Sequence, residues 1–168
     1  MAKLTALSLS IGILGAIWAF LALGPLSAWL LVWAGFLAWG CFFHSGGDGA
    51  ALSKTITGNI YGIIVAWIAL LIIANVPMPA LGAVWPALVV GVTVFLLVIV
   101  SSAGPLSVVP ANVYGYAATV AYTLHEPATG KLLAASFANP LALLIVSMVA
   151  GAVFGFISAK LADAVSKA

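Results

Sequence analysis

Residues 80–101 read ALGAVWPALVVGVTVFLLVIVS and carry no charged side chain. A helix that crosses the hydrocarbon core of a bilayer needs about 20 consecutive, mostly apolar residues, and this run has the required length. Its apolar residues follow one another continuously, whereas in a strand of a membrane barrel they would alternate with polar ones. The stretch therefore predicts a transmembrane α-helix.

The composition extends this prediction to the whole chain. Hydrophobic residues make up 65% of the 168 residues and charged residues only 5%, whereas a soluble domain carries about 25% charged residues. In lipid, backbone polar groups are satisfied only inside helices or closed barrels. We therefore expect an all-α integral membrane protein whose main partner is the lipid bilayer. The net charge of +2 is too small and too dispersed to favour a nucleic-acid partner.

Glycine, proline and charged residues divide the chain into six predicted transmembrane helices within one domain, residues 1–168. These helices cover residues 4–23, 26–43, 54–75, 80–101, 106–124 and 139–159. Pro110 removes a backbone donor, so the fifth helix should be broken or begin late. Asn139 followed by Pro140 predicts a helix cap and a first helical residue. Residues 132–138 would then form a short interfacial helix.

The lysines orient these helices. With six spans, Lys3, Lys54, Lys160 and Lys167 lie on one side of the membrane, together with both termini, and only Lys131 lies on the other. Cytoplasmic segments are enriched in lysine and arginine. We therefore expect a multi-pass protein of the bacterial inner membrane with both termini in the cytoplasm. Because six short helices bury little surface, a homo-oligomer is also expected.

The two halves of the chain are similar in sequence. Residues 24–27 and 104–107 both read GPLS, a spacing of 80 residues. The same register, with one inserted residue at the histidines, pairs Gly35 with Gly115, His44 with His125 and Asn59 with Asn139. It predicts a 3+3 inverted repeat, with halves of about 1–79 and 80–168 that cross the membrane in opposite directions and enclose a pathway between them. The alternative is chance similarity between apolar sequences.

The positions of the charged residues argue against several functions. All eight acids and lysines fall in predicted loops or at helix ends, whereas coupled transporters and cation channels use ionisable groups within the membrane. Cys41 is the single cysteine, and no histidines and carboxylates share metal-ligand spacing. No nucleophile–base pair or carboxylate pair is visible. We therefore expect no catalytic residues, no enzyme activity, no metal and no cofactor.

Neutral polar and aromatic residues remain as candidates for a solute pathway. The predicted pathway residues are Trp33, Asn59, Tyr61, Trp67, Asn112, Tyr114 and Tyr116. A buried amide offers donors and acceptors that can replace the water around a solute, although asparagine can equally bridge or cap helices. His44 and His125 are candidate gating residues because histidine titrates near neutral pH; the alternative is solvated loop histidines. We place the pathway beside the break at Pro110 and predict that Asn112→Leu reduces flux without loss of folding.

Several short motifs resemble a known family. Residues 33–37, WAGFL, the Gly46-Gly47 loop, and residues 106–110, LSVVP, leading into Gly115 look like the small bacterial inner-membrane proteins related to YcdZ. That family is known as domain of unknown function ten-ninety-seven. The chain departs from it in having Pro110-Ala111 where the family tends to have Pro-Gly. The resemblance implies a polytopic inner-membrane protein and supplies no functional residues.

These observations favour a small channel or facilitator that passes a small neutral polar solute such as urea, ammonia or a short amide. One alternative is an ion-coupled secondary transporter of a small metabolite, with backbone carbonyls at the break in the fifth helix as ion ligands. A second alternative is a membrane assembly partner that transports nothing.

Overall fold

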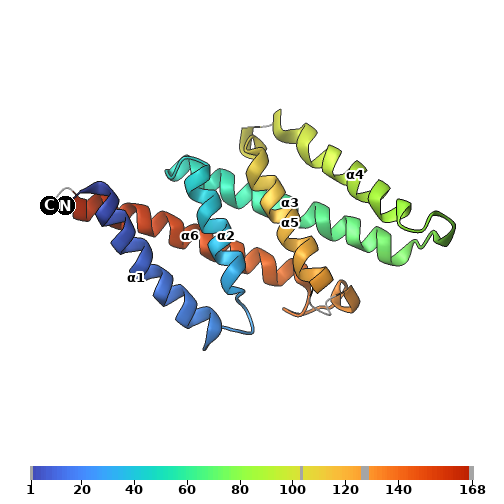
Figure 1. The fold of residues 1–168 in the computed structure, drawn as a ribbon, viewed down its shortest axis with the longest axis horizontal. Helices are drawn as coiled ribbons and strands as arrows, with labels where there is room; N and C mark the ends of the chain where they lie inside the picture. Colours follow the sequence, from blue (N-terminus) through green and yellow to red (C-terminus); the bar gives the residue numbers. More distant parts are fainter. Residues whose placement is uncertain (1, 103, 126–128, 167–168) are drawn as a thin grey trace.

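The computed structural model describes residues 2–102, 104–125 and 129–166, and the regular structure in these ranges is helical (Figure 1). The six α-helices are α1 (Lys3–Leu23), α2 (Val32–His44), α3 (Gly49–Asn75), α4 (Val84–Ile99), α5 (Val109–His125) and α6 (Pro140–Ser166). Four 3-10 helices connect them: η1 (Pro79–Leu81), η2 (Val100–Ser102), η3 (Gly104–Leu106) and η4 (Thr129–Lys131). Glu126 and Lys167 lie outside the described ranges.

Length and apolar character separate four helical segments, one of them α4 continued by η2, from α2 and α5. In the described ranges, the helices long and apolar enough to cross a membrane are Lys3–Leu23, Gly49–Asn75, Val84–Ser102 and Pro140–Ser166. The α2 helix has 13 residues and α5 has 17. At 1.5 Å per residue α2 is about 20 Å long, which is shorter than a hydrocarbon core of about 30 Å. Within the described ranges the all-helical prediction is confirmed, and four helical segments have the length and apolar character of membrane-spanning helices. The α2 and α5 helices fall below that length, so six membrane crossings stay a prediction.

The second helix begins at Val32, six residues later than the predicted start at Leu26. Leu31 is extended, with φ −103° and ψ 115°. Its backbone N–H donates to Ser147 Oγ at 2.9 Å, and Trp18 Nε1 donates to the carbonyl oxygen of Val32 at 2.9 Å. Because these partners come from α1 and α6, tertiary contacts delay the start of the helix.

Two other helix starts follow local signals. Asp48 Oδ1 accepts from the N–H of Ala51 at 2.7 Å, so α3 begins at Gly49 and not at the predicted Lys54. The predicted cap at Asn139 is confirmed, since its Oδ1 accepts from the N–H of Leu141 at 3.0 Å.

Two further predictions concern the segments that precede α5 and α6. The late start of the fifth helix is confirmed, because α5 begins at Val109. Residues 132–138 form turns and a bend, so the predicted interfacial helix is wrong there. The segment is held by polar contacts across its turns: the Nδ2 of Asn139 donates to the carbonyl oxygen of Ala134 at 3.1 Å.

The helices pack as two groups. The most extensive contacts join α3 to α5 and α2 to α6, while α1 packs on α6 and α4 packs on α3. In Figure 1, α1 and α4 therefore lie toward opposite ends of the long axis. We call α1, α2 and α6 the first body, and α3, α4 and α5 the second body; α3 also packs on α6 and joins the two bodies. Each body combines helices from both halves of the sequence.

Glycines allow the closest approach within each body. A Cβ on Gly115 would collide with the backbone of Asn59, and a Cβ on Gly62 would collide with the backbone of Asn112. In the first body, a Cβ on Gly151 would collide with the backbone of Gly35. Small residues are the usual means by which membrane helices approach this closely, so these two crossings are fixed by backbone contact.

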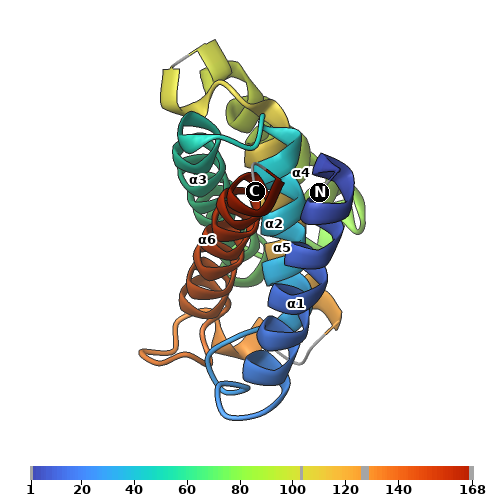
Figure 2. The same cartoon turned by 90° about the vertical axis from the view of Figure 1, so that its left-hand side faces the viewer.

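The connections segregate to the two ends of the bundle. Lys3, Phe43, Gly46 and Asp163 line one pocket at the end where both termini lie (Figure 2). At the opposite end, Leu71 and Asn75 share a pocket with Gly130 and Leu132. The chain therefore alternates between ends as it passes from helix to helix.

Candidate functional site between α2 and α5

The two short helices, α2 and α5, come from different bodies and touch each other at the centre of the molecule. On α5, Tyr114, Ala118, Ala121 and His125 recur at spacings of four, three and four residues, which places them on one helical face. On α2, Trp33, Leu37, Gly40 and His44 recur at the same spacings. The contacts below show that these two faces meet at both ends.

At one end, α2 and α5 are joined by a hydrogen bond. Nδ1 of His44 lies 3.1 Å from Oη of Tyr114, with the donor set by the histidine tautomer. The two ring centroids are 6.1 Å apart at an interplanar angle of 58°. His44 is the last residue of α2, so its imidazole closes this end of the contact against the phenol.

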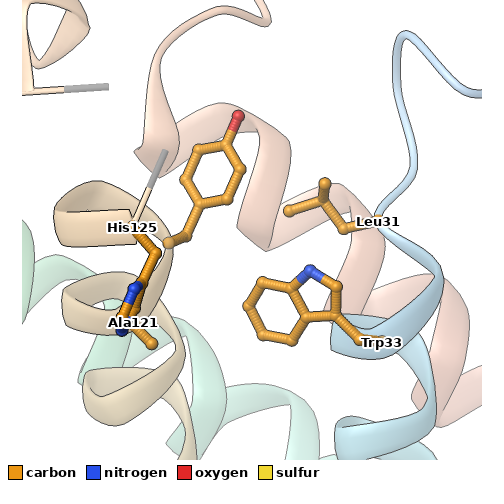
Figure 3. Close-up of a pocket in the computed structure, with 5 residues that line it drawn as sticks. Leu31, Trp33, Ala121 and His125 are labelled. Carbon is orange, nitrogen blue, oxygen red and sulfur yellow. The ribbon is translucent and has the colours of Figure 1, made fainter. Parts of the chain in front are cut away.

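At the other end, the same two helices enclose a pocket of about 410 Å³ (Figure 3). It is lined by Leu31, Trp33, Ala121, Tyr122 and His125. Leu31 and Trp33 lie across the pocket from Ala121 and His125 (Figure 3). The indole of Trp33 is 40% exposed, so an aromatic face and an imidazole are both available to a molecule in the pocket.

The two ends are built from corresponding residues. Trp33 lies eleven residues before His44, and Tyr114 lies eleven residues before His125. Each histidine ends its own short helix and lies near the aromatic residue that stands in the first turns of the other short helix. The arrangement is thus a histidine–aromatic pair at each end, hydrogen-bonded at one end and separated by a pocket at the other.

Between these ends lies a buried apolar cluster that contains both small and large side chains. Ala34, Ala38 and Ala118 are buried in one cluster with Leu144 and Met148. Tyr114 and Tyr122 pack against this cluster from α5. The middle of the α2–α5 contact is therefore closed by packed side chains from several helices.

Asn59 supplies a buried amide beside this cluster. It is 1% exposed, and neither its Oδ1 nor its Nδ2 has a hydrogen-bond partner. Ile56 and Ile63, three residues before it and four after it, pack against the alanine cluster, so the helical period turns Asn59 toward the same region. A buried polar group without a partner costs about 1–3 kcal/mol, which a bound water or solute would offset.

Asn112 is held differently. Its Nδ2 donates to Ser101 Oγ and to the carbonyl oxygen of Leu106, both at 3.1 Å. These bonds tie α5 to the 3-10 turns that precede it. The remaining oxygen, Oδ1, has no partner and faces Gly58 of α3. Asn112 is therefore mainly a connector of the α4–α5 segment.

Three other predicted pathway residues connect elements outside the α2–α5 contact. Tyr61 donates through its hydroxyl to the carbonyl oxygen of Leu96 at 3.3 Å, and the hydroxyls of Tyr116 and Thr93 are 2.9 Å apart. Trp67 Nε1 donates to the carbonyl oxygen of Leu132 at 2.8 Å.

The structure thus divides the predicted residues into two sets. It brings Trp33, His44, Tyr114 and His125 to one contact, with Asn59 in the neighbouring core. It places Asn112, Tyr61, Tyr116 and Trp67 in connecting roles.

The pocket residues Leu31, Ala121 and Tyr122 are not among the residues predicted from the sequence. The spacing of Ala121 and Tyr122, four and three residues before His125, was an available signal because it places them near the histidine on one helical face. Leu31 had none, since its position depends on the bond to Ser147. Within the described ranges, no three histidine, cysteine or acidic side chains group as a metal site would require.

A helical bundle with four segments long and apolar enough to cross a membrane belongs to the class of apolar all-helical proteins and is compatible with a membrane protein. The chain belongs to the family described as Protein of unknown function (DUF1097), whose model matches residues 8–163. This match confirms the resemblance inferred from the sequence motifs. No curated protein and no solved structure matches the chain.

Proposed function

We propose that this protein is a passive facilitator for a small neutral polar solute, with urea, ammonia or a short amide as the class. The observation that carries the proposal is the histidine–aromatic pair at each end of the α2–α5 contact. Such paired ends mark the entrance and the exit of a route between the two bodies. The solute would enter the pocket at Trp33 and His125 and pass the amide of Asn59.

The chemistry of the core favours a neutral solute. In the described ranges, the buried polar side chains are hydroxyls and amides of Ser, Thr and Asn. An amide such as that of Asn59 can donate and accept at once, and it therefore complements a urea or amide solute, which also does both. A buried ionisable group, which ion coupling normally uses, is not among these side chains.

An inverted repeat of six membrane crossings belongs to the same proposal. In such a repeat α3 corresponds to α6 and α5 corresponds to α2. The packing of α3 on α5 then matches the packing of α6 on α2, and α3 and α6 have the same length, 27 residues each. The helix positions change one part of the predicted register. Asn59 lies inside α3 whereas Asn139 precedes α6, so these two residues do not correspond.

The proposed location is the bacterial inner membrane, with both termini in the cytoplasm. The large exposed apolar side chains of α1 and α4, such as Phe20 and Phe95 at 70% and 62% exposure, would then face lipid or another copy of the chain. A homo-oligomer through these outer helices remains part of the proposal.

Stopped-flow swelling of reconstituted vesicles tests the function directly. Vesicles with the protein should swell faster than protein-free vesicles in urea, formamide or acetamide, or alkalinise faster with ammonium salts. Asn59→Leu should lower this flux at least several-fold while the protein still purifies as a single species. Equal permeability of the two kinds of vesicle to every solute would refute the facilitator and favour an assembly partner. Flux that requires a proton or sodium gradient would instead identify a coupled transporter.

A further inference from the structure

We propose that the two ends of the α2–α5 contact open in turn, and that the structure is the state closed at His44 and open at His125. This inference rests on the proposed function, because it describes how a solute would be passed along that contact. It specifies a carrier that exposes its site to one side at a time, in place of a continuous channel.

The two ends differ in state although they are built alike. His44 and Tyr114 are in hydrogen-bond contact at 3.1 Å, and a solute cannot pass between them unless they separate. Their counterparts, Trp33 and His125, line a pocket of about 410 Å³. Exchange of these two local states would produce a structure open at the His44 end and closed at the other.

The packing of the helices indicates how the open and closed ends could interchange. Within each body, the helices cross through backbone contacts at glycine, as at Gly115 against Asn59 and Gly151 against Gly35. Between the bodies, α3 packs on α6, and α2 meets α5 through a smaller contact, beside a buried cluster to which both bodies contribute. Rocking of one unit against another around a central site is the usual movement of inverted-repeat transporters. Here it would separate α2 from α5 while α3 shifts along α6.

Cys41 is a native reporter for the closed end. It is the one cysteine in the sequence, it is 1% exposed, and it lies three residues before His44 on the same helix. Its Sγ lies 4.0 Å from Ser45 Oγ, in the residue after His44, so we expect the thiol to become accessible to a water-soluble reagent when the His44 end opens. The rate of its alkylation therefore measures the population of the open form at that end, and this measurement does not depend on any solute.

The first measurement uses a membrane-impermeant maleimide on the full chain in nanodiscs, where both membrane faces are accessible. Tyr114→Phe removes the hydroxyl that bonds His44. A single hydrogen bond contributes about 0.5–1.5 kcal/mol, so alkylation of Cys41 should become about 2- to 12-fold faster. An unchanged rate would overturn the inference, since the bond would then not hold that end closed.

The second measurement asks whether the two ends are coupled. Ala121→Trp places a bulky side chain in the opposite pocket and should hold that end open, because the pocket can no longer collapse. Alkylation of Cys41 should then fall at least several-fold, also in the double variant with Tyr114→Phe. Leu124→Trp is the control, since Leu124 is 65% exposed in the same helical turn and does not line the pocket.

The outcomes separate this inference from the proposed function. If Ala121→Trp leaves the rate of Cys41 alkylation unchanged or raises it, alternating opening is overturned, even where vesicle swelling shows transport. A rate that falls with Ala121→Trp and not with Leu124→Trp supports it, even where no tested solute is carried.

Discussion

The α5 helix has two faces with opposite properties. Toward α3 it presents Gly115, and the two backbones lie so close that a Cβ would collide with the backbone of Asn59. Toward α2 it presents Tyr114, Ala118 and His125, which make a smaller contact with one hydrogen bond at one end and a pocket at the other. One helix thus carries a fixed crossing and a separable contact. The difference separates the interactions that stabilise the fold from those that the proposed function assigns to the solute route.

The largest expected effect comes from filling the fixed crossing. Gly115→Ala should destabilise the protein by about 1–3 kcal/mol, the range for an overpacked core, because the backbone of Asn59 has little freedom to move. The measurement is the thermal unfolding midpoint in detergent, followed by circular dichroism.

Gly91→Ala is the matched control for that variant. A Cβ at Gly91 meets no heavy atom within 4 Å, and alanine favours a helix by about 1 kcal/mol over glycine, so its midpoint should rise or stay constant. Equal losses in the two variants would show that the α3–α5 crossing is not the fixed one.

The two buried asparagines give the next largest effect. Asn112→Leu removes two hydrogen bonds and leaves buried acceptors unpaired, so it should cost about 1–3 kcal/mol of stability. Asn59→Leu removes an amide without partners and should leave the midpoint unchanged or raise it. This expectation revises the sequence-based one, in which Asn112→Leu would reduce flux with folding intact. A larger loss at Asn59 than at Asn112 would contradict the assignment.

A matched tyrosine pair probes the two faces of α5 more finely. Tyr116→Phe removes a buried bond to Thr93 within the second body and should lower stability by about 1 kcal/mol. Tyr114→Phe removes the exposed bond to His44 and should change the midpoint less, although it accelerates Cys41 alkylation. Both midpoints come from the same thermal unfolding experiment. A larger loss for Tyr114→Phe than for Tyr116→Phe would show that the face of α5 toward α2 carries the fixed contact.

The smallest effect is expected at the termini. Lys3 and Asp163 form an ion pair at 3.6 Å, with side chains 81% and 48% exposed. Exposed pairs contribute about 0–1 kcal/mol, so Lys3→Gln should leave the midpoint nearly unchanged. Ser10→Ala, which removes a buried bond to the carbonyl oxygen of Ser158, should lower it more. The comparison shows whether α1 is held on α6 by charge or by buried contacts.

The sequence predicted the features that depend on neighbouring residues. Pro110 indicated the late start of α5, and Asn139-Pro140 indicated the start of α6, because both signals act within one helical turn. The start of α2 was missed because Ser147 and Trp18, which hold Leu31 and Val32, are distant in sequence.

The candidate site was predictable to a similar extent. The spacing of the histidines could be read from the sequence, and so could the choice of neutral polar residues. The distinction between Asn59 and Asn112 could not, since it depends on whether Ser101 and Leu106 lie within reach. The connecting roles of Tyr61, Tyr116 and Trp67 depend in the same way on partners in other elements.

The exchange of long helices between the two bodies has a consequence for how the chain can be divided. A fragment ending at residue 79 would contain α3 but not α5, and the surface around Gly62 would be left without the helix that covers it. A fragment beginning at residue 80 would lack α3 in turn, and α4 and α5 would both lose their principal partner. Neither fragment contains a complete body, so the two would be interdependent, like the subunits of an obligate heterodimer.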